Sequence, residues 1–127
     1  MADVNRGNRP LSPHLSIYKP QMTSMSSILV RITGNALLVS TLLVVWWLLA
    51  LATSESYFNV ANAVMTSWFG TLVLVLSLWG LWYHLLGGLR HLIWDTGRGL
   101  DVPTAEKMGW VMIVGSVVLT VLTIIIL

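Results

Sequence analysis

Three long runs without a charged residue limit how this chain can fold. They cover Ile32 to Ser54, Ser56 to Leu89 and Met108 to Leu127, with 23, 34 and 20 residues. A helix that crosses the hydrocarbon of a bilayer needs about 20 apolar residues. Only 9% of the 127 residues are charged, whereas soluble domains carry about 25%. We therefore expect an all-α membrane protein with three transmembrane helices in a single membrane-anchor domain over residues 1–127.

The second run is too long for one crossing and too short for two crossings with a turn. We expect a short loop from Ser56 to about Ala63, which predicts helices at about 24–53, 64–94 and 105–127. Helix breakers separate the second and third helices, namely Gly97, Gly99 and Pro103. Thr104 is positioned to cap the third helix. The polar residues 1–23 are expected to form a cytoplasmic docking segment.

The basic residues predict the orientation of the helices in the membrane. All seven precede or open the first helix or surround the second loop: Arg6, Arg9, Lys19, Arg31, Arg90, Arg98 and Lys107. The first loop contains only Glu55 as a charged residue. Because basic residues gather on the cytoplasmic or matrix side, we expect the N-terminus inside and the C-terminus outside. Arg90 is interpreted here as a solvated basic residue of the inner surface.

Composition also bears on compartment and on chemistry. A polar segment of about 24 residues precedes the first apolar run, and that run exceeds the roughly 7–15 residues of a signal-peptide core. We expect a multi-pass protein of the bacterial inner membrane, with the mitochondrial inner membrane as the alternative. The absence of cysteine excludes disulfides, covalent c-type haem and iron–sulfur clusters ligated by this chain. The net charge of +2 is too small to indicate a nucleic-acid-binding surface.

His84 lies within the longest uncharged run. A histidine in hydrocarbon is expensive and marks a functional site by default. The spacing of His84, Gly87, Gly88, His91 and Asp95 places all five on one face of a helix. The glycines would let a flat, rigid body or another helix approach the backbone closely. A haem is such a body, and its iron takes a neutral imidazole nitrogen.

The two histidines cannot ligate the same iron. Seven residues rise about 10.5 Å along a helix, whereas trans ligands of one metal lie about 4 Å apart. A single haem with two histidine ligands therefore needs a second chain. His84 lies roughly 16 Å from Asp95 and His91 about 6 Å from it, which suits His84 as axial ligand and His91 as a propionate or proton-route residue. The alternatives are a histidine that hydrogen-bonds a neighbouring helix and glycines that serve helix packing.

A second group of polar residues lies on one face of the first helix. Ser27 and Arg31 are four residues apart, and Gly34 completes the face. The guanidinium could pair with an anionic propionate or a quinone carbonyl, and the Ser27 hydroxyl could bind the same ligand. Equally, Arg31 could extend to the headgroups and serve no ligand.

Two segments resemble the cytochrome b membrane-anchor subunit of succinate dehydrogenase, respiratory complex II. One is residues 9–18, RPLSPHLSIY, continued by residues 27–34, SILVRITG. The other is residues 84–97, HLLGGLRHLIWDTG. The family usually has histidine immediately before the arginine of the first helix, where this chain has Val30.

The resemblance implies roles for these residues. His84 would be one axial ligand of a haem b, with the other ligand from a second small anchor subunit, and Arg31 and His91 would meet the propionates. Ser27 and Arg31 would line the ubiquinone pocket beside the iron–sulfur subunit. Asp95 would either order water as part of a proton route or make docking contacts at that boundary. The segment from residue 9 to 18 would dock the soluble subunits.

The resemblance also implies a division of labour within a complex. The flavoprotein and iron–sulfur subunits would carry FAD and the clusters and oxidise succinate, and this chain would pass electrons from the iron–sulfur subunit to ubiquinone. Three other interpretations remain: an anchor of a quinol:fumarate reductase, a non-redox helical membrane protein such as a scaffold or small transporter, and a di-haem cytochrome b. The last would need more membrane histidines than His84 and His91.

Overall fold

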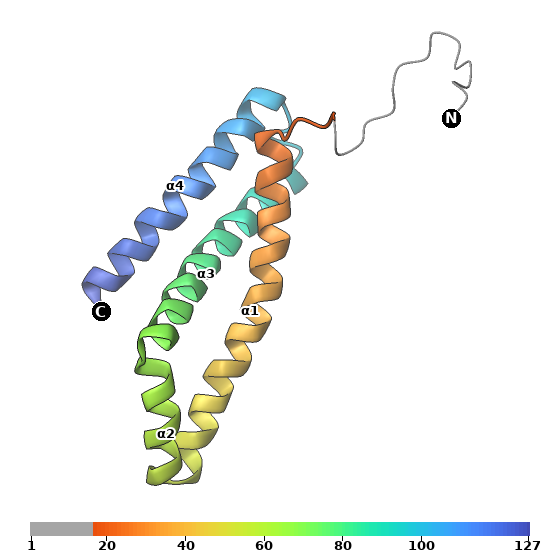
Figure 1. Cartoon of the computed structure of the whole chain (residues 1–127). Helices are drawn as coiled ribbons and strands as arrows, with labels where there is room; N and C mark the ends of the chain where they lie inside the picture. The colour runs from red at the N-terminus through yellow and green to blue at the C-terminus, as the bar shows by residue number, and fades with distance from the viewer. Residues whose placement is uncertain (1–16) are drawn as a thin grey trace, which may run out of the picture.

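The computed structural model describes residues 17–127, and every described element is a helix (Figure 1). The helices are α1 (Met22–Thr53), α2 (Glu55–Thr66), α3 (Trp68–Asp95) and α4 (Val102–Ile126). Three of them, α1, α3 and α4, are long and apolar enough to cross a membrane. The all-helical fold with three candidate spans is therefore confirmed. Most of the expected docking segment, residues 1–16, lies outside the described residues.

The expected loop from Ser56 to about Ala63 is wrong, because this stretch forms the helix α2. The Ser54 side chain accepts a hydrogen bond from the Tyr57 amide and caps α2 at its start. Trp47 then donates from Nε1 to Asn62 Oδ1 at 3.3 Å, which ties α2 back against α1. The charge-free run thus contains a second, shorter helix in place of an irregular connection.

The junction between α2 and α3 lies at Ser67, so the second spanning helix begins at Trp68 and not at about residue 64. Ser67 caps α3 by accepting a hydrogen bond from the Gly70 amide at 3.1 Å. A Cβ on Gly70 would collide with the carbonyl oxygen of Val64 and lie 2.5 Å from that of Met65. Only a residue without a side chain lets the two helices meet this closely.

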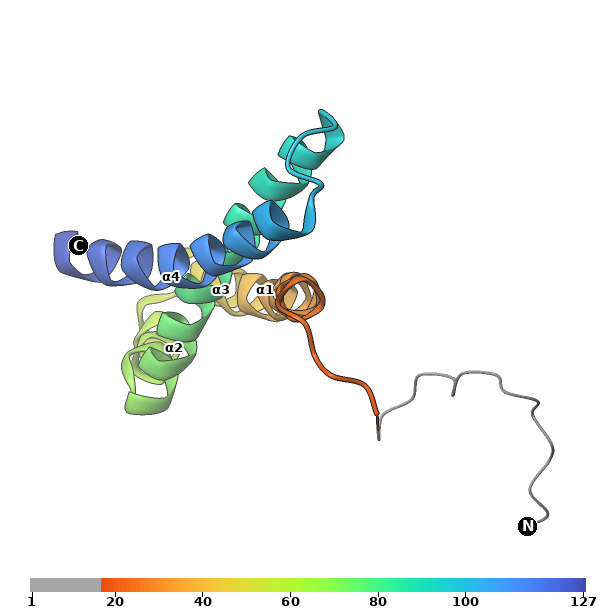
Figure 2. The same ribbon diagram turned by 90° about the horizontal axis from the view of Figure 1, so that it is seen from above.

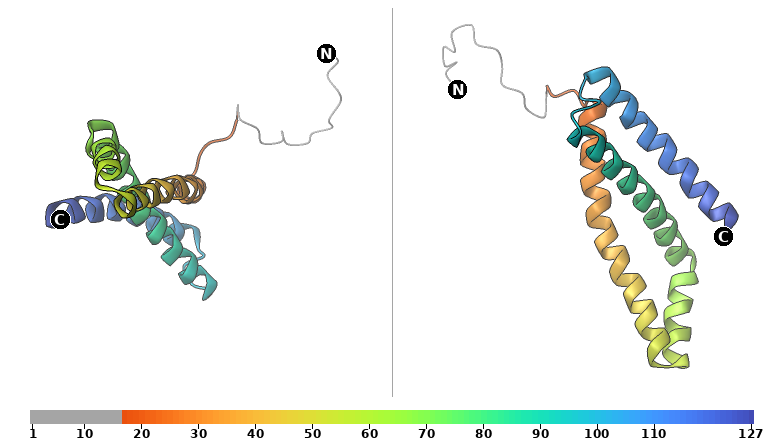
Figure 3. Two further views of the ribbon diagram at one scale, coloured as in Figure 1. Left: turned by 90° about the horizontal axis from the view of Figure 1, so that it is seen from below. Right: turned by 180° about the vertical axis from the view of Figure 1, so that it is seen from behind.

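The three long helices meet at one end of the molecule and diverge toward the other (Figures 1 and 3). The start of α1, the end of α3 and the start of α4 all lie at the upper end of the bundle in Figure 1, which we name the convergent end. Seen from above in Figure 2, the last turns of α3 run away from α1. Viewed along the bundle in Figure 2, α3 crosses between α1 and α4. The C-terminus lies at the divergent end of α4 (Figure 1).

Small residues bring the helices together near the convergent end. A Cβ on Gly87 would lie 2.5 Å from a methyl of Val30 and 3.2 Å from Met112 Cε, so α3 contacts both α1 and α4 at this point. Val30 and Met112 are buried there together with Tyr83. Further along, Trp79 donates to Ser116 Oγ at 3.1 Å and joins α3 to α4. In the absence of a hydrophobic drive between helices in lipid, such close packing and hydrogen bonds hold the bundle together.

The turn between α3 and α4 uses a different cap from the one expected. Asp101, and not Thr104, is the N-cap residue of α4, and its carboxylate accepts a hydrogen bond from the Thr104 amide at 3.1 Å. The hydrogen bonds from Thr104 hold the pKa of the Asp101 carboxyl below its usual value. Gly97 and Gly99 both adopt positive φ, 75° and 69°, which favours glycine at these positions.

Candidate functional site

The imidazole of His84 is held by the backbone of α1. Its Nδ1 lies 3.0 Å from the carbonyl oxygen of Val30. Because a carbonyl oxygen only accepts hydrogen bonds, Nδ1 is the donor, and in the neutral imidazole Nε2 is then the nitrogen with a free lone pair. A ligating histidine in a metal site typically donates its other ring nitrogen to such a carbonyl, which sets the tautomer and the ring orientation. His84 is exposed on the surface of the chain, so a ligand from outside the chain can reach it.

Gly34 makes room for the ring of His84. A Cβ on Gly34 would lie 2.8 Å from Cε1 of His84 and 3.3 Å from Nδ1. Real Cβ atoms essentially never come this close to a neighbour, so any other residue at position 34 would move the ring or the helix. The role of Gly34 is therefore to accommodate the imidazole, which the sequence did not indicate.

The glycine pair on α3 divides between two roles. Gly87 packs against Val30 and Met112 inside the chain, which is the helix-packing alternative for this glycine. Gly88 has nothing within 4 Å of the position a Cβ would take. Gly88 is the glycine that leaves backbone accessible to a body from outside the chain.

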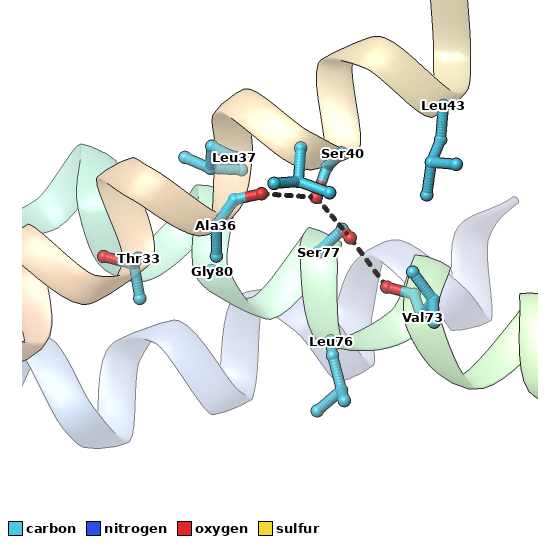
Figure 4. Close-up of a pocket in the computed structure, with 10 residues that line it drawn as sticks. Thr33, Ala36, Leu37, Ser40, Leu43, Val73, Leu76, Ser77 and Gly80 are labelled. Atoms are coloured by element: carbon cyan, nitrogen blue, oxygen red, sulfur yellow. Dashed lines mark hydrogen bonds between the residues drawn. The ribbon is translucent and has the colours of Figure 1, made fainter. Parts of the chain in front are cut away.

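An apolar groove of about 360 Å³ lies between α1 and α3, beside the His84 contact (Figure 4). On α3 it begins at Gly80, one turn from His84, and on α1 it begins at Thr33, next to Gly34. Ser40 and Ser77 meet across the groove with their hydroxyl oxygens 2.7 Å apart. Both hydroxyls also bond backbone carbonyls of their own helices, those of Ala36 and Val73. The groove therefore offers mainly hydrocarbon to whatever occupies it.

The residues expected near a quinone lie on α1 at the convergent end. Ser27 is half-buried, whereas Arg31 is exposed. Arg31 directly follows Val30, whose carbonyl holds His84, and precedes Gly34 by three residues. The structure thus places Arg31 on the same two turns of α1 that carry the contact with the imidazole.

His91 and Asp95 are exposed on the last turns of α3. The His91 ring meets the ring of Trp94 edge-on, with centroids 5.3 Å apart and an interplanar angle of 81°. Asp95 is the last residue of α3. Both side chains remain accessible to a partner or a ligand at the convergent end.

Arg90 is buried, so its interpretation as a solvated surface residue is wrong. Its side chain is 2% exposed and donates from Nη1 to Ser26 Oγ at 2.7 Å. Its guanidinium also lies over the ring of Trp94, 4.6 Å from the centroid. The rotation of α3 that exposes His84 on one side turns Arg90 toward α1 and away from the surface.

His84 is an isolated candidate ligand. Within residues 17–127 there is no group of three or more His, Cys, Asp or Glu side chains that could hold a metal ion. A bare metal ion needs several protein ligands, whereas the iron of a haem needs only axial ones, because the macrocycle supplies the rest. The single imidazole with its free Nε2 fits a haem and not a bare ion.

Comparison with known proteins decides the family. Residues 5–123 match the family model described as the succinate dehydrogenase/fumarate reductase transmembrane subunit. The chain belongs to this family.

Individual relatives in the family cover nearly the whole chain. The succinate dehydrogenase cytochrome b556 subunit of Paracoccus denitrificans is 53% identical over 126 residues, covering 99% of this chain and 97% of the relative. The protein of the same name from Rickettsia conorii is 43% identical, covering 90% and 89%. The cytochrome b560 subunit of Marchantia polymorpha is 35% identical, covering 93% and 90%. The chain is thus a membrane subunit of the succinate dehydrogenase/fumarate reductase type, as its motifs indicated.

Sequence reasoning singled out His84 but missed what surrounds it in this family member. The carbonyl of Val30 carries no sequence signal, because every residue has one. Tyr83 did offer a signal, since it lies seven residues before Arg90 and so shares its face. A tyrosine and an arginine on one face of an apolar helix indicate a polar contact inside the bundle, and Ser26 provides its other side.

Proposed function

We propose that this chain is the membrane-anchoring, haem b-binding and quinone-site subunit of a succinate:ubiquinone oxidoreductase. It passes electrons from the iron–sulfur subunit to ubiquinone. The observation that carries the proposal is the imidazole of His84, which is accessible and is held by the Val30 carbonyl with Nε2 free. The relatives named above are all succinate dehydrogenase subunits, which favours this direction over fumarate reduction.

His84 Nε2 would hold the haem iron together with a histidine of a second small membrane-anchor subunit. Arg31 and His91 would meet the propionates, and the open backbone at Gly88 and the apolar groove beside His84 would accept the uncharged part of the group. When bound, the haem supplies a one-electron carrier. The role of this chain is to orient the ligand and to keep water from the apolar side.

Ser27 and Arg31 are the proposed quinone-binding residues. The hydroxyl and the guanidinium donate hydrogen bonds to a quinone carbonyl, and a cationic donor stabilises the charge that develops there on reduction. Asp95 orders water or docking contacts at the same end. Succinate is oxidised in the flavoprotein and iron–sulfur subunits, which hold FAD and the clusters.

The proposed location is the bacterial inner membrane, with the convergent end of the bundle on the cytoplasmic side. Bacterial relatives and three apolar helices support a multi-pass protein of that membrane. This orientation places Ser27, Arg31 and the start of α1 on the side where basic residues gather. The iron–sulfur subunit docks on that side.

His84→Leu tests the haem site. We expect the reduced-minus-oxidised spectrum of the purified complex to lose its haem signal, because leucine has no lone pair to ligate iron. Leu92→Ala is the control on the same helix: Leu92 is exposed and has no proposed role, so this variant should retain the haem band. An unchanged spectrum in His84→Leu would refute ligation by this residue.

Arg31→Leu tests the quinone site. Loss of a hydrogen bond to a charged group costs about 1.5–3 kcal/mol, so succinate:ubiquinone activity should fall roughly 10- to 100-fold. Succinate oxidation with a soluble artificial acceptor should remain unchanged, because that acceptor bypasses the membrane. Arg98→Leu removes an exposed basic residue at the same end and should change neither rate. Equal losses of both activities in Arg31→Leu would argue against a quinone role.

A further inference from the structure

Arg90 lies at the centre of a polar cluster that joins α3 to the start of α1. Its Nη1 donates to Ser26 Oγ at 2.7 Å, and the hydroxyl of Tyr83 donates to the Ser26 carbonyl at 3.1 Å. Ser26 and Tyr83 are both 0% exposed. Two side chains of α3 therefore bind the same residue of α1: Arg90 binds the hydroxyl of Ser26, and Tyr83 binds its backbone carbonyl.

The Ser26 hydroxyl is the single hydrogen-bond partner of Arg90 within residues 17–127. The remaining nitrogens, Nε and Nη2, are buried without a hydrogen-bond partner among the described residues. Trp94 covers the face of the guanidinium at 4.6 Å. Among the described residues, the hydrogen bond of the Arg90 side chain to α1 is therefore the one to Ser26 Oγ.

The position of Ser26 determines where the next residues of α1 point. Successive residues of a helix are about 100° apart around the axis. With Ser26 facing α3, Ser27 is half-buried and Arg31 is exposed. A rotation of α1 about its axis would displace both side chains together. Displacement of a binding group by about 1 Å can cost about 10²-fold in rate.

We propose that Arg90 is a positioning residue of the quinone site, which through Ser26 sets the rotation of α1 and so orients Ser27 and Arg31. This inference rests on the proposed function of Ser27 and Arg31. Arg90 itself is not proposed to contact the quinone, because its side chain is 2% exposed.

The test uses the intact complex with Ser26→Ala or Arg90→Lys in this chain. Alanine at position 26 is a good helix former and leaves the carbonyl that Tyr83 binds, so the helix should fold. We expect the KM for a short-chain ubiquinone to rise about tenfold, with a much smaller change in kcat, because the binding groups are misplaced. Succinate oxidation by a soluble acceptor and the haem spectrum should not change.

Ser116→Ala is the matched control. Ser116 is also 0% exposed and also accepts a hydrogen bond between helices, from Trp79 on α3, but it belongs to α4. Loss of the hydrogen bond between Trp79 and Ser116 weakens the packing of α3 on α4 without changing the rotation of α1. The KM for ubiquinone should therefore remain that of the wild type. An equal rise in KM in Ser116→Ala would overturn the proposal, because any lost helix contact would then have the same effect.

Arg31→Leu, measured in parallel, distinguishes the positioning role of Arg90 from the proposed quinone site on which it rests. If Arg31→Leu impairs quinone reduction while Ser26→Ala and Arg90→Lys leave the quinone KM unchanged, the positioning role is refuted and the quinone site stands. If Arg31→Leu has no effect on quinone reduction, the quinone site and the positioning role both fall.

Discussion

At the scale of single residues, His84 and Gly34 act as one unit. The ring occupies the volume that a side chain at position 34 would need, and the carbonyl four residues earlier on α1 orients the ring. The backbone of α1 thereby orients the ring. Mutation of the Val30 side chain would not remove this acceptor, because the carbonyl belongs to the backbone.

Gly34→Ala should weaken haem binding. The added methyl would lie 2.8 Å from His84 Cε1, and changes that disturb the orientation of a metal ligand typically cost about 10- to 100-fold in affinity. We expect a lower haem-to-protein ratio in the purified complex, measured by the pyridine haemochrome method.

Gly115→Ala on α4 is the control for this change. A Cβ at Gly115 would lie 3.2 Å from Leu86 Cδ1, the end of a flexible side chain, and has no atom of His84 near it. Haem content should stay normal in that variant. A normal haem content in Gly34→Ala as well would show that the ring does not need its present position.

At the scale of elements, the boundary between α2 and α3 depends on one glycine. Gly70 lies in the first turn of α3 against the last carbonyls of α2, and Ser67 caps the new helix. Hydropathy does not detect this boundary, because the residues on both sides are uncharged. A change of helix direction within an apolar run depends on local backbone contacts.

Gly70→Ala should destabilise the bundle at this junction. Its Cβ would collide with backbone atoms of Val64 and Met65, which cannot move aside like a side chain. Overpacking of this kind typically costs about 1–3 kcal/mol. We expect a lower midpoint of thermal unfolding for the solubilised complex, monitored by the loss of haem absorbance. Gly80→Ala should show no such shift, because a Cβ at Gly80 would lie 3.9 Å from Thr33, an ordinary contact. Equal midpoints for both variants would contradict a special role for Gly70.

At the scale of the whole molecule, the proposed functional residues gather toward one end of the bundle. Ser27 and Arg31 belong to the first turns of α1, and Arg90, His91 and Asp95 to the last turns of α3. The start of α1 and the end of α3 both lie in the upper part of Figure 1. The divergent end carries α2 and the C-terminus. An anchor that must meet soluble subunits on one side only would be expected to place its polar groups in this way.

The proposed orientation can be measured with single cysteines, since the chain has none of its own. In intact spheroplasts, a membrane-impermeant thiol reagent should label this chain when it carries Ser56→Cys, at the start of α2. It should label Arg98→Cys, in the turn after α3, only after permeabilisation. The reverse pattern would place the convergent end outside and would remove the proposed quinone site from the side of the iron–sulfur subunit.

Much of this protein follows from its sequence alone. The three candidate spans and the family follow from local composition and short motifs, which also single out His84 as the candidate ligand. This is possible because insertion of a helix into lipid depends on the residues of that helix, whatever its neighbours are. Motifs such as residues 84–97 likewise need no knowledge of other segments.

Only the tertiary structure decided which faces the helices turn toward each other. The contact between His84 and Val30 joins residues 54 apart in the chain, and the contact between Arg90 and Ser26 joins residues 64 apart. These pairings depend on the rotation of each helix about its axis. Close packing at Gly34, Gly87 and Met112 determines that rotation together with the bond from Arg90 to Ser26. In lipid the hydrophobic effect does not bring apolar helix faces together, so such contacts are needed.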